Sequence, residues 1–192
     1  MIDYKPARKE IQAANQCIEF MKNSKNHDEF EQHWRNFLGH LDKSFNKLLS
    51  ATNPVKGQFT SHFSSRFMHR RSDQTLVYLF QARNTDFHST QDIAQLAPSR
   101  TTLNPPPGVE SHYIKKMEIR NGVVEHYEGD PIIVTFHPST TRVVQIRNQG
   151  KDYPPPSIHL GENLPNNHPT TLAELGVRFY ERWIDESSLE FQ

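Results

Sequence analysis

Hydrophobic residues recur with a helical period over roughly the first 95 residues of the chain. The spacing predicts four helices, at about residues 6–23, 28–50, 58–72 and 73–90. Asp73 stands directly before the fourth of these segments and is expected to be its N-cap. Because the connections between the four segments are short, the pattern favours an antiparallel helical bundle.

Beyond residue 95 the helical period gives way to short segments. Residues 97–110 are rich in proline and are expected to form an extended linker. Four runs typical of short strands follow, at residues 113–120, 123–127, 131–136 and 141–147. Each run ends at a turn signal; in chain order these are Asn-Gly, Glu-Gly-Asp, His-Pro-Ser-Thr and Asn-Gln-Gly. This regular spacing predicts a small antiparallel β-meander.

A helical period returns near the end of the chain, at about residues 171–186. Thr171 and Glu174 have the spacing of a capping box at its start. One face of this helix is apolar and needs a surface to cover it; it carries Leu172, Leu175, Phe179 and Trp183. The predicted fold class is therefore α+β: a helical bundle over residues 1–95, then a β-meander over residues 96–192 with a C-terminal helix packed on the bundle.

Composition narrows the class of protein further. Lys plus Arg and Asp plus Glu each number 22, so any contact with nucleic acid must come from a local basic patch. The single cysteine, Cys17, excludes a disulfide framework, and no apolar run approaches membrane-spanning length. We expect a cytoplasmic protein with no membrane partner. The eleven histidines show no metal-ligand spacing and no Gly-rich phosphate loop occurs, so we expect no metal and no cofactor.

The segment LVYLFQARNTDFH, residues 76–88, carries the most informative pattern for function. At helical spacing an arginine, Arg83, shares a face with Leu76, Leu79, Phe80 and Phe87. A guanidinium among apolar side chains needs a carboxylate from its own fold or an anion from outside, and phosphate suits its geometry. His88 follows about one turn later and adds a titratable imidazole. The combination indicates phosphodiester chemistry.

The spacing of Arg83 and His88 is not unique in a chain with twelve arginines and eleven histidines. Three pairs have four or five intervening residues: Arg35/His40, Arg83/His88 and Arg120/His126. Arg35 lies one turn from Glu31 and on the same face as Asp42, which indicates a solvated ion-pair surface. Arg120 precedes Asn-Gly, a hairpin signal. Only Arg83 lies on an apolar helical stripe.

The N-terminal half, over roughly residues 5–95, resembles the HEPN superfamily. The resemblance rests on a long helix with the sequence HWRNFLGHL, a phenylalanine-rich helix, and the segment ARNTDFH that closes the bundle. The signature of that superfamily is an arginine followed by a polar residue, with a histidine after four to six intervening residues. Arg83, Asn84 and His88 match it position for position.

The resemblance implies a helical homodimer that cleaves RNA without a metal ion at a cleft in the dimer interface. Arg83 would hold the scissile phosphate and stabilise the transition state, and His88 would shuttle the proton during attack by the ribose 2′-hydroxyl. Asn84 would orient His88 or contact a phosphate oxygen. The product would carry a 2′,3′-cyclic phosphate. Such a ribonuclease fits a defence or toxin–antitoxin setting, with a cognate antitoxin or regulatory protein as a further partner.

A basic group precedes the motif helix. Such a group is usually a solvated helix face, but its length and its position directly before the motif helix make it a candidate RNA-binding track. Its members are Arg66, His69, Arg70 and Arg71.

Two other interpretations compete with catalysis. In the first, the same fold is a catalytically inert HEPN-like scaffold that binds RNA or a protein through its cleft. In the second, the protein is a helical adaptor in which Arg83 is buried against a carboxylate, such as Asp73 or Asp86, and the β-meander is the interaction surface. Under the catalytic interpretation Asp86 is expected to face solvent.

Overall fold

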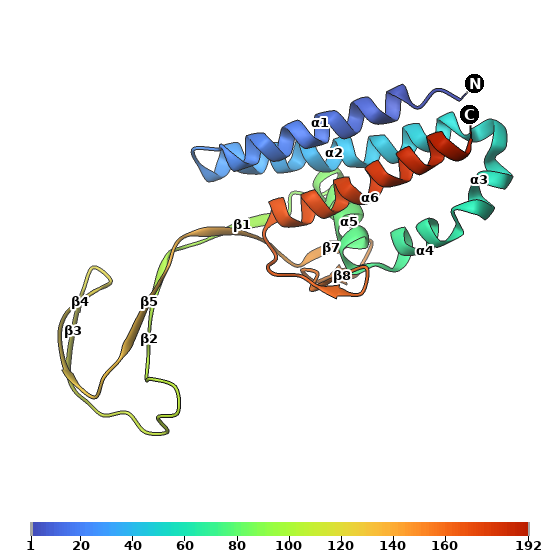
Figure 1. Ribbon diagram of the computed structural model, residues 1–192. Helices are drawn as coiled ribbons and strands as arrows, with labels where there is room; N and C mark the ends of the chain where they lie inside the picture. Colours follow the sequence, from blue (N-terminus) through green and yellow to red (C-terminus); the bar gives the residue numbers. More distant parts are fainter. Residues whose placement is uncertain (1, 192) are drawn as a thin grey trace. The chain divides into compact units, whose positions relative to one another are not determined.

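The computed structural model describes residues 2–191 and has an α+β fold, which confirms the predicted class (Figure 1). The helices are α1 (Lys5–Lys22), α2 (His27–Ala51), the 3₁₀ turn η1 (Asn53–Val55), α3 (Lys56–His62), α4 (Ser64–Ser72), α5 (Gln74–His88) and α6 (Pro169–Glu190). The strands are β1 (Ala94–Ala97), β2 (Arg100–Asn104), β3 (Ile114–Arg120), β4 (Val123–Gly129), β5 (Ile133–His137), β6 (Thr140–Val143), β7 (Ile146–Asn148), β8 (Lys151–Tyr153), β9 (Ile158–His159) and β10 (Glu162–Asn163). Within residues 2–191, no helix combines the length and the apolar character needed to cross a bilayer.

The chain divides into two units. The helical unit comprises residues 2–95 and 141–191, and the hairpin unit comprises residues 96–140. This division differs from the expected one into residues 1–95 and 96–192. Residues 141–191 return to the helices because α6 packs on α1, α2 and α5, as Figure 1 shows.

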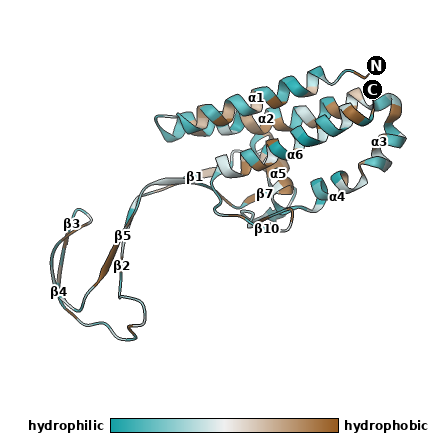
Figure 2. Cartoon of the chain, in the orientation of Figure 1, coloured by the Kyte–Doolittle hydropathy of each residue, from teal (hydrophilic) through white to brown (hydrophobic). Residues whose placement is uncertain are grey.

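The core of the helical unit is built from the apolar faces that the sequence pattern predicts. Figure 2 shows hydrophobic residues on the sides where the helices meet. Trp34 on α2 and Trp183 on α6 are fully buried, and Leu172 and Phe179 of the predicted apolar face of α6 are buried with them. This burial explains why α6 belongs to the same unit as α1, α2 and α5.

Helix α6 begins two residues earlier than expected, and the predicted capping box is wrong. The N-cap is His168, whose side chain accepts a hydrogen bond from the Thr170 amide. Thr171 lies inside the helix and donates its hydroxyl to Asn166 Oδ1, while Glu174 forms an ion pair with Lys22 of α1. Pro169 at the first helical position makes the earlier start favourable, because proline needs no amide partner there.

The predicted third helix is two helices, α3 and α4, separated at Phe63. The backbone bends there, and the rings of Phe59, Phe63 and Phe67 all lie within 6.2 Å of the Trp183 ring, centroid to centroid. A straight helix turns 100° per residue, so three side chains spaced four apart drift around its axis. We infer that the bend brings all three rings to one tryptophan.

The predicted β-meander is not formed, because the strands pair in a nested order. β3 and β4 form a hairpin, β5 pairs with β2, and β6 pairs with β1. The expected linker therefore contains a strand: residues 100–104 include two threonines and no proline, and they pair with β5. The prolines of the linker, Pro98 and those at residues 105–107, lie on either side of this strand. Two expected turns are confirmed, Asn121-Gly122 between β3 and β4 and Gln149-Gly150 between β7 and β8, each with two positive φ angles.

Candidate functional site

Helix α5 carries the predicted catalytic residues, and its first turn is fixed as expected. The Asp73 side chain accepts a hydrogen bond from the Leu76 amide at 2.9 Å, so Asp73 is the N-cap. The buried stripe that follows runs through Leu76, Leu79 and Ala82. It ends before Phe87, which was predicted to lie on it but is 73% exposed. The end of α5 is therefore accessible to solvent.

Arg83 has a carboxylate partner within its own fold. Its Nε lies 3.4 Å from Oδ2 of Asp42 on α2, where the expected partners were Asp73 or Asp86. Its Nη1 donates a hydrogen bond to Asn84 Oδ1 at 3.1 Å, and its guanidinium lies 5.1 Å from the centroid of the Phe87 ring. The Arg83 side chain remains 31% exposed. The Arg83 guanidinium is thus held by Asp42 and Asn84 and is still partly open to solvent.

Asp42 is shared between two arginines. Arg70 on α4 places Nη2 3.7 Å from Asp42 Oδ1, and its Nε donates to the Tyr180 hydroxyl. The Arg70 guanidinium also lies over the Phe45 ring, 3.9 Å from its centroid. Arg70 was predicted to contact RNA, and its own contacts instead join α4 to α2 and α6. One carboxylate therefore faces two guanidinium groups, of which only Arg83 is near the end of α5.

A second ion pair joins α2 to α5 one turn beyond Arg83. Arg35 pairs with Asp86, and it also pairs with Glu31 at 2.8 Å. Asp86 is therefore half-buried and paired, and the expectation that it faces solvent is wrong. The predicted pairing of Arg35 with Glu31 is confirmed, whereas Asp42 pairs with Arg70 of α4 and Arg83 of α5. The seam between α2, α4 and α5 holds three arginines and three carboxylates.

Asn84 and His88 differ in how far they are enclosed. Asn84 is half-buried and accepts the hydrogen bond from Arg83, and His88 is the last residue of α5 and is exposed. Five positions separate Arg83 from His88, which on a regular helix is about 140° of rotation and about 7.5 Å of rise. Within residues 2–191 no hydrogen bond or ion pair joins Arg83, Asn84 and His88 as a set; only Arg83 and Asn84 are hydrogen-bonded to each other.

The rest of the predicted RNA-binding group is spread around α4. Arg66 pairs with Glu186 of α6 and lies over the Phe179 ring. His69 is half-buried, and Arg71 is exposed. Arg66 and Arg70 thus contact α6, and of the four side chains only Arg71 is exposed, so α4 does not present them as one continuous track.

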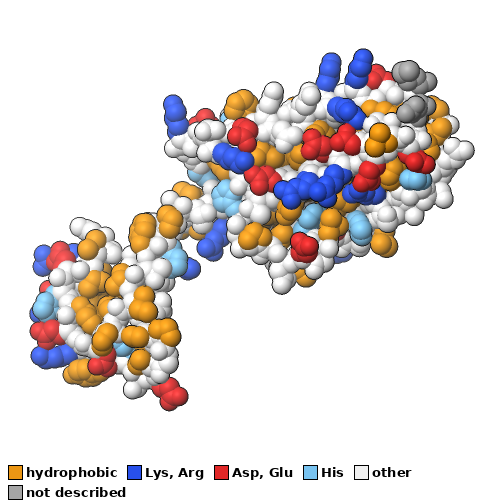
Figure 3. All heavy atoms as spheres, in the orientation of Figure 1, with side chains coloured by type: hydrophobic (Ala, Val, Ile, Leu, Met, Phe, Trp, Pro, Cys, Tyr) orange, Lys and Arg blue, Asp and Glu red, His pale blue; other side chains and the backbone are white. Residues whose placement is uncertain are grey.

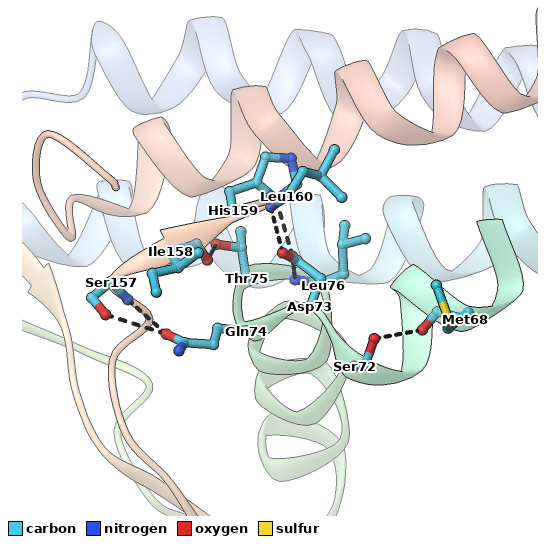
Figure 4. Close-up of polar contacts among 10 residues, drawn as sticks. All are labelled: Met68, Ser72, Asp73, Gln74, Thr75, Leu76, Ser157, Ile158, His159 and Leu160. Atoms are coloured by element: carbon cyan, nitrogen blue, oxygen red, sulfur yellow. Dashed lines mark hydrogen bonds and ion pairs between the residues drawn. The ribbon is translucent and has the colours of Figure 1, made fainter. Parts of the chain in front are cut away.

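A second polar cluster, which no sequence pattern indicated, lies at the start of α5, where residues 157–160 contact the helix (Figure 4). His159 Nδ1 lies 3.0 Å from Asp73 Oδ1, and the Leu160 amide donates to Asp73 Oδ2 at 2.7 Å. Thr75 donates its hydroxyl to the Ile158 carbonyl in the same region. Burial opposes ionisation of Asp73, but the hydrogen bonds from His159, Leu160 and Leu76 outweigh it and lower the pKa of that carboxyl. Asp73 therefore fastens the β9–β10 hairpin to α5.

Within residues 2–191, no three His, Cys, Asp or Glu side chains are grouped closely enough to hold a metal ion. No protein-family model matches the chain, and neither a curated protein nor a solved structure is significantly similar to it. A relationship to the HEPN superfamily therefore stays a prediction from the sequence, on the Arg83, Asn84 and His88 motif and the expected order of helices.

Proposed function

We propose that the protein is a metal-independent endoribonuclease of HEPN type that acts as a homodimer. The observation that carries the proposal is the position of the motif: Arg83, Asn84 and His88 all lie in the last turns of α5, where the buried stripe has ended and Phe87 is exposed. A guanidinium and an imidazole at an accessible helix end are groups that can bind a phosphodiester and move a proton.

The contacts of Arg83 leave it able to take an anion. Asp42 neutralises Arg83 only in part, because Arg70 faces the same carboxylate. One Arg83 nitrogen is directed to Asp42 and another to Asn84, which leaves further N–H donors for a phosphate oxygen. Fixing the guanidinium before substrate binds is favourable for catalysis, since less conformational freedom is lost in the transition state.

A dimer would bring an arginine and a histidine together even though Arg83 and His88 of one chain point in different directions. The two side chains are about 140° apart around one helix, so a single α5 does not turn both toward one phosphate. If two copies of α5 meet about a two-fold axis, Arg83 of one chain can face His88 of the other. The exposed Phe87 lies between them and offers apolar surface for such a contact.

A ribonuclease assay with EDTA present tests the proposal. We expect the purified protein to cut single-stranded RNA under these conditions and to leave 2′,3′-cyclic phosphate ends, and we expect no cleavage of a matched RNA with 2′-deoxyribose throughout. Intact RNA after prolonged incubation, or cleavage that chelation abolishes, would overturn it.

The ion pair between Arg83 and Asp42 favours a second candidate, the catalytically inert scaffold. In the seam between α2, α4 and α5 the arginines and carboxylates are equal in number, so Arg83 does not require an external anion for its burial. The scaffold would bind RNA without cutting it. A gel-shift experiment beside the cleavage assay separates the two functions.

A further inference from the structure

A cavity of about 220 Å³ lies in the helical unit, between α4, α6 and the β9–β10 hairpin. The functional groups that line it are mostly basic: Arg66, Arg178, Arg182 and His159, with Glu162 as the one carboxylate. Figure 3 shows Lys and Arg side chains gathered over α6. The volume is below the roughly 300–1,000 Å³ of most sites for drug-sized ligands, so it suits a small ion or one end of a larger molecule.

Arg178 and Arg182 are the reason to expect a ligand here. They lie one turn apart on α6, both are exposed, and neither has an ion-pair partner among residues 2–191. Like charges at this spacing repel one another and destabilise a helix slightly. Arg66 is already balanced by Glu186, so the two arginines of α6 exceed Glu162 by one positive charge at the cavity.

His159 adds a polar group to the cavity, and a contact with Asp73 orients its imidazole ring. Its Nδ1 is directed to the buried Asp73 carboxylate, which also accepts hydrogen bonds from the amides of Leu76 and Leu160. Figure 4 shows the ring held between Asp73 and α6. An ionised carboxylate accepts a hydrogen bond from Nδ1–H, which leaves Nε2 as the ring atom available to the cavity. Only 9% of the His159 side chain is exposed, so this atom has few alternatives in solvent.

We propose that this cavity binds a phosphate group. Arg178 and Arg182 would contact its oxygens with their guanidinium forks, and His159 Nε2 would donate a further hydrogen bond when protonated. Phosphate fits this set better than a carboxylate because it offers three or four acceptor oxygens to donors that converge from different directions. The same chemistry is present in inorganic phosphate and in a terminal phosphate of a nucleotide or RNA. The proposal does not depend on cleavage at Arg83.

Calorimetric titration with inorganic phosphate tests the site, with the double variant Arg178→Gln/Arg182→Gln. We expect the wild type to bind phosphate and the double variant to bind at least about tenfold more weakly, the scale of losing two charge-assisted hydrogen bonds. Arg142→Gln is the matched control, since Arg142 is an exposed arginine elsewhere in the helical unit, and it should bind like the wild type. Circular dichroism confirms that each variant is folded.

A second titration identifies the source of the phosphate. An oligoribonucleotide with a 5′-phosphate is compared with the same oligoribonucleotide ending in a 5′-hydroxyl. Tighter binding of the phosphorylated form, lost in the double variant, assigns the site to a terminal phosphate. Binding of inorganic phosphate without that preference assigns it to the free ion. No phosphate binding by the wild type, or equal binding by the wild type and the double variant, overturns the proposal.

Discussion

Arg83 of α5 and Asp42 of α2 form an ion pair, with Nε and Oδ2 3.4 Å apart, and the same Asp42 carboxylate also faces Arg70. The shared carboxylate determines whether Arg83 has a structural role or a role in binding an anion. An arginine with a carboxylate of its own would be a structural group, whereas Arg83 shares its carboxylate, keeps about a third of its side chain exposed, and has N–H donors left for a second anion.

The strength of the pair can be measured with a double-mutant cycle of Asp42→Asn and Arg83→Gln in urea unfolding. We expect a coupling free energy of about 1 kcal/mol or less, because Arg83 is partly solvated and its partner is divided between two arginines. The pair Arg8–Asp185, which is more exposed, is the reference and should give still less. A coupling of several kcal/mol would show that Arg83 is mainly a structural residue.

Asp73 should make the protein sensitive to acid. Its folded-state pKa is lowered, so the stability it contributes is fully present above the unfolded pKa, about 3.9, and is lost as the pH falls through the folded pKa. Asp73→Ala removes the N-cap and leaves the Leu160 amide and His159 without their partner, so we expect a loss of about 2–4 kcal/mol near pH 7.

The control for Asp73 is Asp73→Asn, which keeps an N-cap oxygen but not the charge. It should cost less than Asp73→Ala, and its free energy of unfolding should fall less steeply than that of the wild type below about pH 4. Urea unfolding from pH 3 to pH 7 measures both effects. Parallel curves for the wild type and Asp73→Asn would show that the carboxylate charge contributes nothing.

A cut in residues 97–110 should not separate α6 from the other helices. Leu172 and Trp183 are buried against the helical unit, and each such side chain contributes about 1.5–3 kcal/mol by burial. After limited proteolysis the two fragments should elute together in native size exclusion and part only in denaturant. Release of an N-terminal fragment that keeps full helicity would contradict this account of the fold.

The dimer should depend on the end of α5. Light scattering should give twice the mass of the chain, and Phe87→Asp should shift it to the monomer, because a charge in an apolar interface is costly to desolvate. Phe136→Asp, at a similarly exposed phenylalanine of the hairpin unit, should leave the dimer intact. A monomer mass for the wild type would remove the basis for a shared site.

Local patterns were enough to predict most of the helices and some of their ends, although not the break at Phe63 between α3 and α4. The apolar repeats that place Trp34 on α2 and Trp183 on α6 are long and strongly periodic, and the N-cap role of Asp73 follows from the residues beside it. The turns at Asn121-Gly122 and Gln149-Gly150 were predictable for the same reason, since two adjacent residues decide the backbone conformation.

Pairings between distant segments were not predictable in this way. By sequence alone β5 could pair with β4 or with β6, the strands next to it in the chain. It pairs with β2, whose strand pattern was not recognised because the prolines at residues 105–107 follow it directly. Asp42 is 41 positions from Arg83, and His159 is 86 from Asp73, so no spacing signals either contact. Arg178 and Arg182 have no sequence pattern that indicates a site, because only the fold brings His159 to the same cavity.

The rate of RNA cleavage by single variants, measured with EDTA present, tests the proposed function most directly. Arg83→Ala and His88→Ala should each lower the rate by about two to four orders of magnitude, the usual effect of removing a charge-stabilising or proton-transferring group. Arg120→Ala, from a pair with nearly the same spacing on the exposed β3–β4 hairpin, should cleave at the wild-type rate. Equal rates for all three variants, or a loss at Arg120 alone, would contradict the account.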